Sequence, residues 1–183
     1  MSELSKLFDQ LDAFKLPPIE KWHPEKSVDI DIRIDGNGLW HYQGSLIRRH
    51  RISKLFSTVL RLEGDNYYLV TPPVKYRITV DDVPFSAVEM NTLGENENQK
   101  LFFRTNMDDV VLADSDHPIE IKVNTRTHGP LPYIEVRDGL KAKIVRSVYY
   151  ALTDLLVVFP SCPAGQSRYG IYSSNTFFEF GEI

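Results

Sequence analysis

Two basic residues occupy positions where an amphipathic helix would turn them toward its apolar side. Arg48 lies four residues before Ile52 and Lys141 lies four residues before Val145, each at the start of a predicted helix. A cation in line with an apolar stripe needs a carboxylate or a bound anion nearby, because desolvating it alone is costly. Free N–H donors at a helix start also favour a carboxylate or phosphate group. The pattern therefore predicts a pocket for a small anion between two halves of the chain.

Further residues can be assigned to the same pocket. Arg77 lies in an outward-facing row of a predicted strand, and Trp40 and Tyr133 fall on equivalent positions when the second half of the chain is laid over the first. The predicted ligand-binding set is Arg48, Lys141, Arg77, Arg104, Trp40 and Tyr133. The alternative is structural: long basic side chains lay their stems along apolar surface while the charged heads reach water.

Catalytic and metal-binding patterns are weak. The histidines are scattered, with no His-Glu-x-x-His pattern, so we predict no metal and no cofactor. The Gly-x-Gly of "DGNG" lacks the third glycine of a dinucleotide fingerprint, because that position is His41. A hydrolase or transferase remains an alternative, with Asp109 and His117 as the first residues to test. Whether the chain is an enzyme is left open, and a non-enzymatic role is favoured.

The periodicity of apolar residues indicates the elements that must position these side chains. Residues 3–14, 47–62 and 140–156 carry apolar residues at helical spacing, which predicts one short and two long amphipathic helices. Residues 28–34 alternate, and "DGNG" follows, which predicts a hairpin whose return strand is 39–42. The stretch from 66 to 80 predicts two more strands, with Pro72 and Pro73 at the turn.

These elements favour an α+β fold of two lobes. Each lobe is predicted to repeat a strand-helix-hairpin motif and to pack one long helix on an antiparallel sheet. The predicted units are an N-terminal helix and connector at 1–27, an N-terminal lobe at 28–92 and a C-terminal lobe at 93–183. The polar loop "TLGENENQK" marks the boundary between the lobes.

Composition restricts the partners and the compartment. A net charge of −4 disfavours nucleic acid, because phosphate backbones attract basic surfaces. Apolar runs are too short for a membrane span, and the first residues are charged and amphipathic, so neither a membrane nor an export signal is predicted. One cysteine cannot form an intramolecular disulfide. We therefore expect a cytoplasmic protein.

Several stretches in a fixed order resemble a known family. They are "DGNGLWHYQGSLIRRHRISKLFSTVLRLEGDNYYLVTPPVKYRITVDDVPF", "FRTNMDDVV", "HPIEI", "PYIEVRDGL" and "YGIYSSNTFFEFG". Together they are similar to bacterial proteins of the family called domain of unknown function 1285, over nearly the whole chain. The resemblance implies a two-lobed α+β protein with repeated motifs and a role in signal transduction through binding, without an established activity or cofactor.

Three functions follow as hypotheses. The first is a regulatory or signal-transduction module that binds a small anionic ligand between the lobes. The second is a protein-interaction module, through self-association or a protein partner, that uses residues 3–14 or an exposed sheet edge. The third is the hydrolase or transferase named above.

Overall fold

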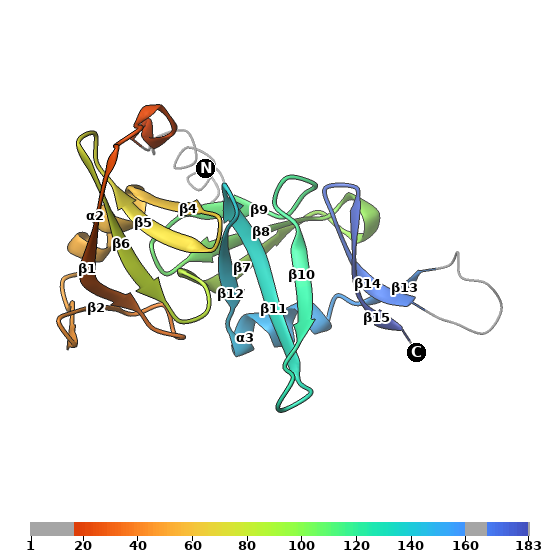
Figure 1. Ribbon diagram of the computed structural model, residues 1–183. Coiled ribbons are helices and arrows are strands. Elements are labelled where there is room, and N and C mark those ends of the chain that lie inside the picture. The colour runs from red at the N-terminus through yellow and green to blue at the C-terminus, as the bar shows by residue number, and fades with distance from the viewer. Residues whose placement is uncertain (1–16, 160–167, 183) are drawn as a thin grey trace.

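The computed structural model describes residues 17–159 and 168–182 (Figure 1). The helix predicted over residues 3–14 lies outside the described residues. Within them the chain is mostly β, with fifteen strands, two α-helices and two short 3₁₀ segments at Ile19–Lys21 (η1) and Asn96–Asn98 (η2). Figure 1 shows the three sheets following one another across the molecule.

The first sheet is built by the N-terminal half of the chain and has the strand order β3-β2-β1-β6-β5-β4. The pairing of β1 with β6 is parallel and the other pairings are antiparallel. The hairpin predicted around "DGNG" is confirmed, with Ile34 opposite Trp40 and Gly38 at a φ of 76°. The strands are β1 (Lys26–Ile34), β2 (Trp40–Tyr42), β3 (Ser45–Leu46), β4 (Leu60–Glu63), β5 (Asn66–Val70) and β6 (Val74–Val80).

The second sheet has the order β10-β11-β12-β7-β8-β9, and here β12 pairs parallel with β7. The third sheet is antiparallel, in the order β13-β14-β15. The strands are β7 (Phe85–Leu93), β8 (Lys100–Thr105), β9 (Val110–Leu112), β10 (Ile119–Val123), β11 (Pro130–Arg137), β12 (Leu140–Ile144), β13 (Val157–Phe159), β14 (Arg168–Ser173) and β15 (Thr176–Glu182).

The predicted fold class, α+β with antiparallel sheets that each pack one long helix, is wrong. Two of the sheets are mixed, and the described helices are short: α2 (His50–Thr58) and α3 (Arg146–Thr153). The helix predicted over 47–62 stops at Thr58, and β4 begins two residues later. Apolar residues at Leu60 and Leu62 fit a strand as well as a helix, because a short run satisfies both periods.

The helix predicted over 140–156 is also wrong at both ends. Residues 140–144 form β12, in which Leu140, Ala142 and Ile144 are buried and the lysines between them are half-buried. This is the period of two that a strand with one buried face requires. Only Arg146–Thr153 is helical, and the chain then enters β13.

A single apolar core joins the two halves. It runs from Ile32 and Trp40 in the first sheet through Phe85 and Phe103 in the second to Phe178 in the third. Polar contacts reinforce the junction, because Ser86 Oγ donates to the Asn37 carbonyl at 3.1 Å and Asn106 Nδ2 donates to the Gly38 carbonyl at 3.0 Å. The first hairpin is therefore fixed against the second sheet at its turn.

Candidate functional site

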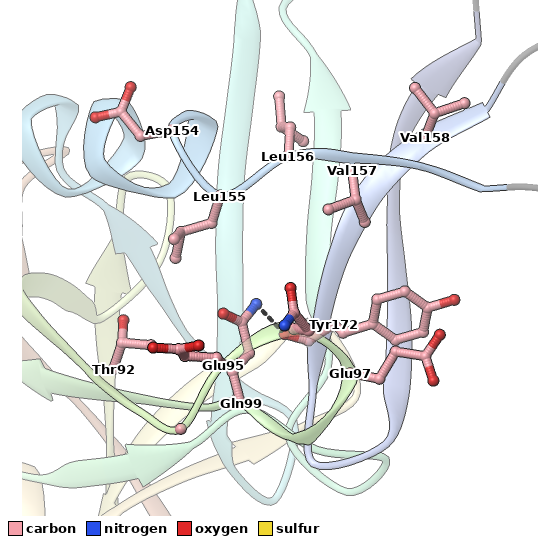
Figure 2. A pocket seen from close by; sticks show the side chains of 12 residues that line it. Thr92, Glu95, Glu97, Gln99, Asp154, Leu155, Leu156, Val157, Val158 and Tyr172 are labelled. Carbon is pink, nitrogen blue, oxygen red and sulfur yellow. Dashed lines mark hydrogen bonds between the residues drawn. The ribbon is translucent and has the colours of Figure 1, made fainter.

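An open cleft of about 560 Å³ lies beside the third sheet (Figure 2). One wall comes from the turn between β7 and β8, and the opposite wall from the segment that leaves α3 and enters β13. The end of β7 and the turn contribute Thr92, Gly94, Glu95, Asn96, Glu97 and Gln99, the opposite wall contributes Asp154, Leu155, Leu156, Val157 and Val158, and β14 contributes Tyr172. A concave surface of this size can hold a small organic ligand or a peptide side chain.

Gln99 joins the β7–β8 turn to the third sheet. Its side chain is buried, and Nε2 donates to the Tyr172 carbonyl at 2.7 Å, as Figure 2 shows. The backbone N–H of Ser174 donates in return to the Gln99 carbonyl at 2.9 Å. Gly94 shapes the turn, since its φ is 81° and an added Cβ would lie 3.0 Å from the Asn98 carbonyl oxygen. Two hydrogen bonds of Gln99 therefore fix the β7–β8 turn against the third sheet beside the cleft.

The cleft has an acidic rim and an apolar side. Glu95, Glu97 and Asp154 line it, and no Lys, Arg or His is among its lining residues. No ion pair with these carboxylates occurs within the described residues. In Figure 2 Leu155 and Val157 point toward Gln99 and Tyr172, whereas Leu156 and Val158 point away. A negative field over a partly apolar surface selects against small anions at this place.

The carboxylates of the cleft are not arranged as a metal centre. Within residues 17–159 and 168–182, no group of three or more His, Cys, Asp or Glu side chains could hold a metal ion. Asp109 and His117, the pair suggested for hydrolysis, are each engaged separately: Asp109 with Arg137 at 3.0 Å and His117 with Asp114 at 3.0 Å.

Three of the predicted cationic residues already have carboxylate partners. Arg77 forms an ion pair with Asp29 at 2.7 Å, and Lys141 forms one with Glu120 at 2.7 Å. Arg104 contacts Glu89, and at 3.6 Å also Asp108. These partners neutralise the charges that a bound anion would otherwise balance.

Arg48 and Lys141 are positioned differently from each other. Lys141 lies on β12, so the helical alignment that suggested its role does not occur. Arg48 lies two residues before α2, is exposed, and has no ion-pair partner within the described residues. Arg104 is joined to the same helix indirectly, since Asp108 also accepts a hydrogen bond from Lys54 of α2 at 2.8 Å.

The two aromatic residues of the predicted set lie in the interior. Trp40 is 1% exposed and packs on Phe56 of α2, with ring centroids 6.0 Å apart. Tyr133 lies on β11, opposite Lys143 of β12, and its hydroxyl donates to Asp82 at 3.0 Å. Lys143 also contacts Asp82, at 3.1 Å. Tyr133 and Lys143 thereby bind the connection between β6 and β7 to the second sheet.

The environment of Tyr133 raises the pH at which its phenol ionises. Burial, and then the hydrogen bond to the Asp82 carboxylate, raise the pKa of the Tyr133 phenol to about 12. In the unfolded chain this tyrosine ionises near pH 10, so the stability due to neutral Tyr133 is complete below pH 10 and is lost as the pH rises toward 12. We expect Tyr133→Phe to lower the free energy of unfolding at neutral pH by about 1.5 kcal/mol and to flatten this alkaline decline.

Urea unfolding between about pH 7 and pH 12, on the wild type and Tyr133→Phe, measures both effects. Tyr42→Phe is the control, because its side chain is exposed. Identical alkaline slopes for wild type and Tyr133→Phe would show that Tyr133 ionises normally.

The sequence did not single out the residues of the cleft. Glu95, Glu97 and Gln99 lie in "TLGENENQK", for which the sequence predicts only a polar loop between the two lobes. The available signal was the charge of this loop: its two glutamates precede its one lysine, Lys100, which lies in β8. Asp154 could not have been assigned to the cleft from the sequence, because the fold of distant residues brings it near this loop.

The fold and the cleft together define a mostly β protein in which two mixed sheets share one core and a third sheet forms a cleft at the side. The chain belongs to the DUF1285 family. Residues 17–83 match the family model described as "Domain of unknown function (DUF1285), N-terminal domain", and residues 84–180 match "Protein of unknown function (DUF1285), C-terminal domain". The predicted family is confirmed.

Two solved structures of this family resemble the chain. A DUF1285 family protein from Silicibacter pomeroyi DSS-3 is 37% identical, with a TM-score of 0.85 over 97% of this chain and 95% of that one. A DUF1285 family protein from Shewanella baltica OS155 is 25% identical, with a TM-score of 0.53 over 67% of this chain and 90% of that one. No curated protein matches the chain. In the described residues, no helix has the length and apolar character needed to cross a membrane.

Proposed function

We propose that this chain is a non-enzymatic binding module, and that its cleft receives an organic cation with an apolar portion. The observation that carries the proposal is the composition of the cleft: its three carboxylates have no cationic partner in the described residues, and its partly apolar lining includes no basic residue. An amine or guanidinium group fits this charge. A cellular role in signal transduction through binding is part of the same proposal.

Each feature of the cleft has a complementary feature in such a ligand. Glu95 and Glu97 supply a negative potential that attracts an ammonium or guanidinium group. Leu155 and Val157 offer apolar surface, and removing it from water stabilises the complex by about 25 cal/mol per Å². The ring of Tyr172 adds a face with which a cation can interact.

A thermal-shift screen of the full chain tests this proposal. The probes are arginine methyl ester, phenethylamine and hexylamine, each compared with a carboxylate of similar size. We expect the amines to raise the melting temperature and the carboxylates to have no effect at the same concentration, because only bound ligand stabilises the folded state. Glu95→Gln with Glu97→Gln should remove most of this increase.

Glu25→Gln is the matched control, since Glu25 is exposed in the segment before β1 and is not among the lining residues of the cleft. An equal response to amines in the double variant and in Glu25→Gln would argue against the cleft as the site. Raising the salt concentration should weaken the response, because the carboxylates are open to solvent.

The small anionic ligand is a second candidate, at a different place. It is favoured by Arg48, Arg49 and Arg51, which are exposed at the start of α2 and have no carboxylate partner within the described residues. The carboxylate arm of the same screen, extended with inorganic phosphate, tests it. Stabilisation by phosphate that is lost in Arg48→Ala would favour an anion site at α2 over the cleft.

A further inference from the structure

An open groove of about 290 Å³ lies between the first sheet and α2. Five of its six lining side chains are hydrocarbon, and the sixth is a tyrosine. They are Ile30 and Ile32 of β1, Tyr42 of β2, Ile47, and Ile52 and Phe56 of α2. Tyr42 is 45% exposed and Ile52 is 37% exposed, so this apolar surface is in contact with water. An apolar group that covered the groove would be bound by the hydrophobic effect.

The size of the groove favours a small molecule over a protein partner. Its volume is at the lower end of the range for small-molecule sites, which is about 300 to 1,000 Å³. A stable protein–protein interface uses about 20 to 30 residues on each side, and six residues line this groove. A single alkyl chain is an occupant of this scale.

Two arginines lie at the end of the groove that Ile47 and Ile52 form. Arg48 follows Ile47 directly in the chain. Arg49 lies three residues before Ile52 and seven before Phe56, which places it on the same face of α2, and its carbonyl accepts the Ile52 N–H at 2.9 Å. Both arginines are exposed, and neither has an ion-pair partner within the described residues. Because the first turn of α2 contains no acidic residue, the positive charge at this end of the groove complements an anion.

We propose that the groove is a binding site for a medium-chain alkyl carboxylate. The alkyl chain covers the apolar lining, and the carboxylate lies beside Arg48 and Arg49. An uncharged chain would leave the arginines unpaired, and inorganic phosphate would leave the apolar lining in water, so a ligand with both parts fits the site best. The proposal goes beyond the cation-binding cleft, which shares no lining residue with the groove, and it gives the anion considered at α2 an apolar tail.

Isothermal titration calorimetry of the full chain with hexanoate, octanoate and decanoate tests the apolar part of the site, with every probe below its micelle-forming concentration. Each added methylene should tighten binding about threefold, because the groove removes it from water. Hexanoate should therefore bind about eightyfold more weakly than decanoate, too weakly to stabilise the chain at the concentrations of the amine screen. Octan-1-ol has the tail of octanoate without the charge, and it should bind about tenfold more weakly than octanoate.

Variants of α2 with matched controls locate the ligand. Ile52→Gln should weaken octanoate binding about tenfold. Leu55→Gln should leave it unchanged, because Leu55 is 63% exposed on the same helix and does not line the groove. Arg49→Gln should weaken octanoate binding about fivefold without changing the binding of octan-1-ol. Arg51→Gln is its control, since at 100° per residue Arg51 lies about 140° from Phe56 around α2.

Equal octanoate affinities in Ile52→Gln and Leu55→Gln, each shown to be folded by near-ultraviolet circular dichroism, would overturn the proposal. Equal affinities of the wild type for octanoate and octan-1-ol would do the same. A dimer that octanoate dissociates in sedimentation velocity would assign the groove to a second copy of the chain instead. Glu95→Gln with Glu97→Gln should leave octanoate binding unchanged, so a failed amine screen does not remove this site, whereas loss of octanoate binding in that double variant would contradict it.

Discussion

Replacing Arg137 with methionine is expected to lower the free energy of unfolding by roughly 3 kcal/mol, because it leaves a carboxylate without its partner in a largely buried place. Arg137 Nη1 donates to Asp109 at 3.0 Å, with the two side chains only 14% and 17% exposed. Arg137 Nη2 donates to the Ser57 carbonyl at 2.8 Å, in the last turn of α2. One side chain thus joins α2 to β11 and to the turn between β8 and β9.

The size of this effect follows from the geometry of the Arg137 guanidinium group. The guanidinium reaches its two acceptors with two separate nitrogens held in a rigid plane, whereas an ammonium would have to reach both from a single nitrogen. Arg137→Lys should therefore retain only part of the stability. Removing the carboxylate as well, in Arg137→Met with Asp109→Asn, should recover some of the loss, because no charge is then left buried and unpaired. Urea unfolding followed by tryptophan fluorescence measures all three variants.

Arg104→Met is the matched control for this prediction. Arg104 also lies on a strand of the second sheet and pairs with a carboxylate, but Arg104 and Glu89 are 39% and 46% exposed. Exposed pairs of this kind contribute about 0 to 1 kcal/mol. Similar losses for Arg137→Met and Arg104→Met would mean that burial is not what makes Arg137 important.

The hairpins could be predicted from the sequence because their signals are local. Asp35 Oδ1 accepts hydrogen bonds from the backbone N–H groups of Asn37 and Leu39, at 2.9 and 3.0 Å, so the turn is stabilised by its own residues. The lengths of the helices could not be predicted, since Leu140 and Ile144 fit both helical and strand spacing. What decides between them is the pairing of β12 with its sequence neighbour β11 and with β7, which is distant in sequence.

Less of the candidate site than of the fold could be predicted from the sequence. Helical phase points to Arg48 and Lys141, and a strand position points to Arg77. Whether such a cation is available to a ligand depends on the partners that folding brings to it, such as Asp29 for Arg77 and Glu120 for Lys141. The cleft is assembled from the β7–β8 turn and the end of α3, more than fifty positions apart in the chain. Only the acidic character of the β7–β8 turn could be predicted from the sequence.

Trp40 is the residue for which the sequence-based hypothesis and the structure lead to different expected results. As a ligand-binding residue, Trp40 could be changed with loss of binding and little loss of stability. It is instead 1% exposed, in the core, against Phe56. We expect Trp40→Ala to lower the free energy of unfolding by about 4 kcal/mol, through lost apolar burial and the cavity left behind.

Trp40→Phe should be much less harmful than Trp40→Ala, at about 1 to 2 kcal/mol. The indole Nε1 is buried and has no hydrogen-bond partner within the described residues, so phenylalanine removes a polar group that contributes no bond while keeping most of the apolar volume. Leu39→Ala is the neighbouring control, because Leu39 is 47% exposed and should change stability by less than about 0.5 kcal/mol. Chemical denaturation followed by circular dichroism is suitable for every variant. Equal losses in Trp40→Phe and Trp40→Ala would show that the indole N–H does have a partner, and that the interior around α2 is held by a hydrogen bond as well as by packing.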